Sequence, residues 1–165
     1  MERRTVEPRQ LSAREWGPFG WVPVRDTDPS DGSQTLQFEW GDPHVNVICH
    51  RREEVPETAR GLLCEMLFHH FTHTQALLVL NCRALIAVAP VSCGFVHASD
   101  LDQIRAFLLE PHDSVVIAPG IWHWGPFPTS SEQVDLFNVQ GRGYARDNER
   151  ADLGAFGGVE VVAHV

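Results

Sequence analysis

The sequence contains no lysine: its 13 basic residues are all arginines, against 22 acidic residues among 165. Because lysine forms Schiff bases, anchors pyridoxal phosphate and completes the phosphate-binding P-loop, its absence excludes these three kinds of chemistry. The net charge of −9 gives an acidic surface. Such a surface repels a phosphate backbone and no basic stripe offsets it, so we expect no nucleic-acid partner.

Cysteines and long apolar runs are also scarce. The four cysteines lie 15, 18 and 11 positions apart without a CxxC pair, which fits neither a zinc ribbon nor a small disulfide scaffold. We expect buried thiols in a reducing compartment. The N-terminal residues lack the apolar stretch of a signal peptide, and no window approaches the roughly 20 apolar residues of a membrane-spanning helix. We therefore expect a cytoplasmic protein with no membrane partner.

Short runs of β-branched and aromatic residues, separated by turn residues, predict strands. The length fits one domain over residues 1–165, and seven or more strands in such a chain predict an all-β sandwich or barrel. The predicted strands cover residues 35–40, 45–49, 63–68, 76–80, 84–89, 114–118 and 134–139, with a further one at 159–163.

Two capping boxes predict the only helices. A Ser-x-x-Glu pattern predicts one helical turn at residues 12–16. A Ser-x-x-Asp pattern, followed by apolar residues at helical spacing, predicts a helix over residues 99–109 that Pro111 ends. Residues 142–158 are rich in Gly, Arg and Asp, which predicts an irregular covering segment.

Histidine is abundant, with nine residues in the chain. Three of them, His69, His70 and His73, lie in the segment FHHFTHTQ. His123 lies in the segment APGIWHW, where it restarts an extended chain after a Pro-Gly turn. Because imidazole serves both acid–base catalysis and metal binding near neutral pH, these two segments mark a candidate active site.

The two segments resemble the two motifs of cupins, HxHxxxxE and PxGxxH. In the first motif Phe68 takes the position of the first histidine, His70 that of the second, and Gln75 that of the glutamate. The resemblance implies a cupin jelly-roll β-barrel. It also implies His70, Gln75 and His123 as a metal set. An amide brings no charge, so we expect either no cofactor or a weakly held divalent metal, unless another histidine of the first segment contributes.

Over roughly residues 10–143 the chain resembles the ureidoglycolate lyase family. The matching features are LSAREWGPFG near the start, HxxxTQA from His70, DQIRAFLL from Asp102, IWH at residues 121–123 and DLFNV from Asp135, all in the family's order and spacing. The resemblance implies an enzyme of purine catabolism, in allantoin degradation, that cleaves ureidoglycolate into glyoxylate and urea. It also implies a homodimer, which the exposed edge strands of an open jelly-roll favour as well.

The chain departs from that family at polar positions. The family generally has an arginine where this chain has His69 and a second histidine where it has Trp124. The late strand of the family ends in an acidic residue and an arginine, where this chain has Gln140 and Gly141. These changes predict an altered substrate or a relaxed activity.

The surviving residues suit the cleavage of a hemiaminal. This reaction needs a base to take the hydroxyl proton and an acid to protonate the leaving nitrogen, and histidine performs both roles near neutral pH. We predict His70 and His123 as this pair, with Gln75 as an orienting hydrogen-bond partner. The resemblance implies that the family's arginine at the position of His69 lies near the substrate carboxylate. Arg83 or Arg142 is a candidate to bind that carboxylate in its place.

Further side chains are candidates for contact with the substrate: His69, His73, Trp122, Trp124 and Asp135. Each has a structural alternative. The histidines would pack outward, the tryptophans would line the core, and the aspartate would be a buried structural acid that bonds a histidine. The alternative for His70 and His123 is a pair of core histidines bonded to carbonyls. For Gln75 it is a strand-pairing amide.

Three classes of function remain open. The first is a cupin lyase of the ureidoglycolate lyase type. The second is a metal-dependent cupin with isomerase, dehydratase or oxygenase chemistry, which metal analysis of the protein with and without His123 would identify. The third is a non-catalytic cupin that binds a small molecule, which would bind a ligand without turnover.

Overall fold

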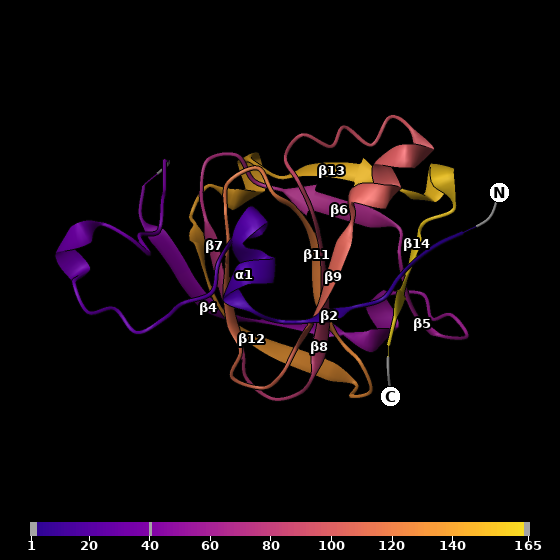
Figure 1. The fold of residues 1–165 in the computed structure, drawn as a ribbon, viewed down its shortest axis with the longest axis horizontal. Helices are drawn as coiled ribbons and strands as arrows, with labels where there is room; N and C mark the ends of the chain where they lie inside the picture. The colour runs from indigo at the N-terminus through magenta and orange to yellow at the C-terminus, as the bar shows by residue number, and fades with distance from the viewer. Residues whose placement is uncertain (1–2, 40, 164–165) are drawn as a thin grey trace.

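The computed structural model describes residues 3–39 and 41–163, and these residues form three β-sheets. In Figure 1, β4, β7 and β12 lie on one side, β5 and β14 on the other, and β8, β9 and β11 between them. The five-stranded sheet has the order β3 (Gly20–Trp21), β10 (Ser114–Ile117), β7 (Gln75–Val79), β12 (Gln133–Gly141), β4 (Pro43–Arg51). The six-stranded sheet has the order β13 (Glu149–Asp152), β6 (Met66–His69), β11 (Trp122–Pro128), β8 (Ala84–Ala89), β9 (Arg105–Leu109), β2 (Arg9–Gln10). The three-stranded sheet has the order β1 (Arg4–Val6), β14 (Val159–Val162), β5 (Gly61–Cys64).

The six-stranded sheet is the middle layer and is buried on both faces. All six residues of β8 are buried, and their side chains alternate between two cores because successive residues of a strand point to opposite faces. Ile86 and Val88 pack in the core that faces the five-stranded sheet. Leu85 and Ala87 pack in the core that faces the three-stranded sheet.

The core between the two large sheets is closed by α1 (Ala13–Trp16). Ser12 caps this helix by accepting a hydrogen bond from the Glu15 amide at 3.2 Å, as the sequence predicts. Trp16 has no exposed surface and packs edge-on against Phe19 and Phe107. Its indole nitrogen donates to the Val116 carbonyl at 3.0 Å, so the one polar atom of this buried side chain is satisfied.

At the other end of this space the inward side chains become polar. Along β12 the buried residues are first Val134 and Leu136, then Asn138 and Gln140. The neighbouring strand β4 has Asn46 directly opposite Asn138. One half of the space between the sheets is therefore filled by a hydrophobic core, and the other half is lined by amides and histidines.

The predicted all-β class is confirmed, and the two large sheets face each other without closing into a continuous barrel. The short remaining helices are η1 (Gly17–Phe19), η2 (Pro29–Asp31), η3 (Arg52–Glu54), η4 (Ala98–Gln103), η5 (Tyr144–Arg146) and η6 (Gly154–Phe156). No helix among the described residues has the length and apolarity needed to cross a membrane.

The predicted helix over residues 99–109 is wrong beyond its first half. The chain forms the 3₁₀ helix η4 and then enters β9 at Arg105, where it pairs with β8. Within β9 four of the five residues are buried, since it belongs to the middle layer. A strand covered on both faces is apolar throughout, so it lacks the alternation by which strands are recognised.

Other boundaries also differ from the prediction. Residues 63–68 fall in two strands, β5 and β6. Residues 35–39 form an isolated bridge from Phe38 to His73 instead of a strand, and Trp40, the last residue of that prediction, lies outside the described residues. The segment 142–158 is not wholly irregular, because it contains β13.

Candidate active site

A cavity of about 430 Å³ opens at the polar end of the space between the two large sheets. Strands of both sheets and the loop after β12 line it: Asn46, Ile48, Cys49, His50, Glu54, Phe68, His70, Gln75, His123, Trp124, Gly125, Phe127, Gln140, Tyr144 and Asn148. A narrow inner recess continues from it, lined by His70, His73, Gln75, Ile117, Ala118, Ile121 and His123. The chemically active side chains therefore gather at the inner end.

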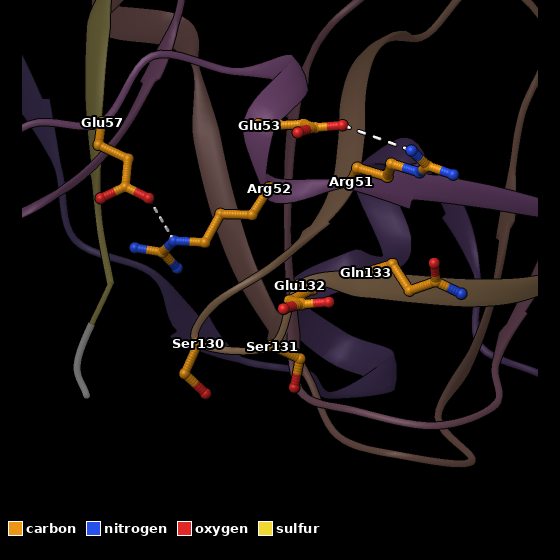
Figure 2. Close-up of a pocket in the computed structure, with 8 residues that line it drawn as sticks. All are labelled: Arg51, Arg52, Glu53, Glu57, Ser130, Ser131, Glu132 and Gln133. Carbon is orange, nitrogen blue, oxygen red and sulfur yellow. Dashed lines mark hydrogen bonds and ion pairs between the residues drawn. The ribbon is translucent and has the colours of Figure 1, made fainter.

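A larger hollow of about 580 Å³ lies elsewhere on the surface (Figure 2). Its two arginines are already paired, Arg51 with Glu53 at 3.4 Å and Arg52 with Glu57 at 2.5 Å. A third carboxylate, that of Glu132, also lines it. Since both of its arginines are paired and it holds no histidine, we do not regard this hollow as the reaction site.

Strand geometry brings the predicted residues His70, Gln75 and His123 into one cavity. His123 lies on β11 between two tryptophans, and the alternation of the strand turns its side chain away from Trp122, which packs in the opposite core. His70 directly follows β6, and Gln75 is the first residue of β7. The imidazole ring centres of His70 and His123 are 5.3 Å apart.

Both of these histidines are oriented by backbone carbonyls. Nδ1 of His70 lies 2.9 Å from the Asp147 carbonyl oxygen, and Nδ1 of His123 lies 3.1 Å from that of Ile121. A carbonyl oxygen can only accept, so each Nδ1 carries the hydrogen and each Nε2 holds a free electron pair. Both rings are thus fixed in the form that accepts a proton at Nε2.

His73 also belongs to this cluster, with its ring stacked on that of His70 at 4.6 Å. Its Nδ1 lies 3.6 Å from a carboxylate oxygen of Asp147. The same carboxylate accepts hydrogen bonds from the amide and the hydroxyl of Thr72, the former at 2.6 Å. Burial would raise the pKa of Asp147, but the hydrogen bonds outweigh it and the pKa is lowered. Asp147 therefore holds His70 through its backbone carbonyl, whereas the Nδ1 of His73 lies 3.4 Å from the hydroxyl of Thr72, which is itself bonded to the Asp147 carboxylate.

All three histidines are neutral at pH 7. Burial is the main cause: it lowers the pKa of His123 to about 3 and that of His73 to about 4. Burial also lowers the pKa of His70, although its bond to Asp147 opposes the shift. His70 additionally lowers the pKa of both His73 and His123, because two positive charges so close together repel each other.

A row of amides forms the opposite wall. Gln75 Nε2 donates to Asn138 Oδ1 at 2.9 Å, and Asn138 Nδ2 donates to Asn46 Oδ1 at 2.8 Å. Because each amide donates its N–H toward Asn46, the oxygen Oε1 of Gln75 remains at the inner end of the row. Among the described residues, the buried side-chain polar atoms without a partner are this oxygen and His73 Nε2. Both residues line the inner recess, which is too narrow to hold a water molecule, and Gln75 also lines the wider cavity, which a ligand can enter.

The protein is expected to lose stability as the pH falls from about 6.5 to about 4. In this interval the unfolded chain binds protons at His73 and His123, whose folded pKa values are about 4 and about 3. Because the unfolded state then binds more protons than the folded state, the free energy of unfolding rises with pH. The stabilisation from the two neutral histidines is fully present above about pH 6.5 and is lost as the pH falls below that value. Urea denaturation midpoints measured across this interval test the expectation. Equal midpoints at both ends would contradict it.

Two predicted substrate contacts face away from the cavity. The His69 ring stacks on Trp122 with 3.6 Å between centres, and its Nε2 lies 3.1 Å from a carboxylate oxygen of Glu149. Trp122 donates from its indole nitrogen to the Cys93 carbonyl at 2.9 Å. The alternation of β6 and β11 places both side chains on the far side of the middle sheet, so neither of them lines the cavity.

Three further predictions concern charged residues outside the cavity. Asp135 lies on the outer face of β12, where its side chain accepts hydrogen bonds from Gln133 and Asn81, so it does not line the cavity. Arg83 pairs with Glu110 at 2.8 Å. Arg142 is exposed and borders a separate depression. Neither arginine lines the histidine cavity.

Trp124 does line the cavity, where β11 departs from regular pairing with β8. Gln140 and Gly141 are explained as well. Gln140 lines the cavity, while a Cβ on Gly141 would lie 2.7 Å from Cγ of the His73 ring. A side chain at position 141 is therefore incompatible with the observed place of His73.

The implied metal set does not match the arrangement of these residues. Within residues 3–39 and 41–163, no group of three or more His, Cys, Asp or Glu is positioned to hold a metal ion. The set of His70, Gln75 and His123 offers two imidazoles and an amide, with no charge to offset that of a divalent cation. The residues present do not fit a tightly bound cation, and no step below involves one.

Comparison with known proteins identifies the family of the chain. No curated protein matches the chain closely enough to count as a relative. The family model described as ureidoglycolate lyase matches residues 30–156, later at both ends than the predicted extent of 10–143. It thus leaves out the first matching segment and includes the loop that carries Asp147. The match covers most of the chain and supports a lyase-type function, and the chain therefore belongs to the ureidoglycolate lyase family.

Proposed function

We propose that this protein cleaves the carbon–nitrogen bond of a ureido carbinol, a small compound whose hydroxyl and ureido groups share one carbon. Ureidoglycolate, which yields glyoxylate and urea, is the type compound of this class. The observation that carries the proposal is the pair formed by His70 and His123, with ring centres 5.3 Å apart and each Nδ1 held by a carbonyl. The family match supports the same reaction type.

The chemistry requires one proton to move from oxygen to nitrogen. An imidazole Nε2 of the pair takes the hydroxyl proton, the oxygen electrons form the carbonyl double bond, and the carbon–nitrogen bond breaks. The leaving nitrogen keeps that electron pair and receives the proton from the imidazolium. Because the rings are neutral at pH 7, one of them can act as the base. Once it is protonated, it donates a hydrogen bond to the second ring, and this bond stabilises its positive charge.

A product assay tests this function. The purified protein is mixed with a ureido carbinol in its acid form and, separately, in its carboxamide form, and urea and the aldehyde are quantified. We expect both products in equal amounts from at least one form, above the uncatalysed rate. Binding of both forms without any release of urea would instead identify a non-catalytic binding protein and contradict the proposal.

A further inference from the structure

We infer that the cavity selects an uncharged ureido carbinol over the corresponding carboxylate. This inference rests on the proposed function, because it names the substrate class of the same site. The first observation is charge. None of the described residues that line the cavity or its recess is Arg or Lys, and Glu54, at the exposed end, is the one acidic residue among them.

A carboxylate at the inner end would find no counter-charge. His70, His73 and His123 are neutral, and the charge that lies beside His73, at 3.6 Å from its Nδ1, is the negative one of Asp147. Withdrawing a carboxylate from water without a cationic partner is strongly unfavourable. The acid group of a ureido acid would therefore oppose binding.

Hydrogen-bonding capacity points the same way. Gln75 is 8% exposed and His73 is 2% exposed, and the unpartnered atoms that they present are the acceptors Oε1 and Nε2. Acceptors need donors, and a carboxamide supplies N–H groups at the position where the acid has a carboxylate. A carboxylate only accepts, so it would leave both atoms unsatisfied and face them with a third acceptor.

The fold also keeps cations out of the inner end. The His73 ring occupies the space that a side chain at position 141 would need. Arg142 and Arg146 line their own depression of about 290 Å³, and Arg83 is engaged by Glu110. The inner end of the cavity, which His70, Gln75 and His123 line, is thus uncharged and rich in acceptors.

The decisive experiment compares two substrates that differ in one group. Ureidoglycolate and its carboxamide, 2-hydroxy-2-ureidoacetamide, are given to the unaltered protein under identical conditions, and kcat/KM is measured for urea release. We expect a value at least about tenfold higher for the carboxamide, since a buried unpaired charge is penalised and an amide is not. An equal or higher value for the acid would overturn the inference and leave the proposed function intact.

Binding of inert analogues separates the two claims. Ureidoacetate and ureidoacetamide lack the hydroxyl group and cannot react, so calorimetry reports their affinity alone. Tighter binding of ureidoacetamide is expected even if neither substrate is cleaved, in which case the proposed function fails and the charge preference stands. A preference for ureidoacetate would overturn the inference, and it is the result expected if the amide row ran in the reverse direction and presented Gln75 Nε2.

A matched pair of variants tests the acceptor. Gln75→Leu removes Oε1 from the recess, while Gln133→Leu makes the same change on the exposed start of β12. We expect Gln75→Leu to weaken ureidoacetamide binding by about tenfold, the loss typical of one buried hydrogen bond, and Gln133→Leu to leave it unchanged. Unaltered binding by a folded Gln75→Leu protein would overturn the role of Oε1. If this variant does not fold, the comparison of ureidoacetate with ureidoacetamide decides.

Discussion

The His123→Ala protein is expected to lose turnover of its ureido substrate by about 10²-fold to 10⁴-fold, the usual loss when one acid–base group is removed. The side chain is 8% exposed, and its ring is held between the Ile121 carbonyl and the His70 ring. Removing it leaves His70 without the partner that shares the proton. Steady-state rates of urea release measure this loss.

Controls separate catalysis from folding in this experiment. His123→Gln keeps a polar side chain but has no base, so its rate should fall like that of the alanine variant while its circular dichroism stays unchanged. His112 lies outside both histidine segments and has a left-handed backbone with φ of 75°, which asparagine tolerates. His112→Asn should therefore retain full activity. A fully active His123→Ala protein would refute the assigned role.

The second large effect concerns stability: Trp16→Ala should lower the free energy of unfolding by about 3–5 kcal/mol. Trp16 is completely buried against Phe19 and Phe107, and its removal leaves a cavity and takes the indole donor away from the Val116 carbonyl. Since domains of this size are stable by only about 5–15 kcal/mol, this change threatens folding at 37 °C. Urea denaturation monitored by circular dichroism measures it.

Trp16→Phe is the matched comparison. It keeps an aromatic ring in the core but loses the indole N–H, so we expect a smaller loss of about 1–3 kcal/mol. Val24→Ala, at a side chain that is 60% exposed, should change stability by less than about 0.5 kcal/mol. A loss for Trp16→Ala as small as that of Val24→Ala would show that the helical turn does not close the core.

The sequence predicted well where local chemistry decides the structure. Ser12 caps α1 because the cap is made within four residues. His70 and His123 meet because each motif combines a strand with a turn, and such turns return the chain to the same end of the sheets. Gln75 joins them for the same reason, as the first residue of β7.

The predicted site residues that lie outside the cavity are those whose direction depends on strand parity or on the number of sheet layers. Val134 and Leu136 are the inward residues of β12, so Asn138 shares their face and Asp135 does not. The period of two thus pointed to Asn138, although the motif drew attention to Asp135. His69 and Trp122 required knowledge of a third layer, since only that layer makes the far side of β6 and β11 a second interior. Asp147 has no local signal, because its partners lie more than 70 positions away.

The residue that orients His70 directly, and His73 through Thr72, belongs to a connection between strands and not to a strand. Asp147 lies between η5 and β13, in a loop that leaves the five-stranded sheet and enters the six-stranded one. Loops of this kind accept exchange more readily than the sheets they join. Exchanging the loop at residues 142–148 would therefore change the contacts that orient both rings in a single step. This makes the loop a suitable target for directed evolution of new reactivity in the same scaffold.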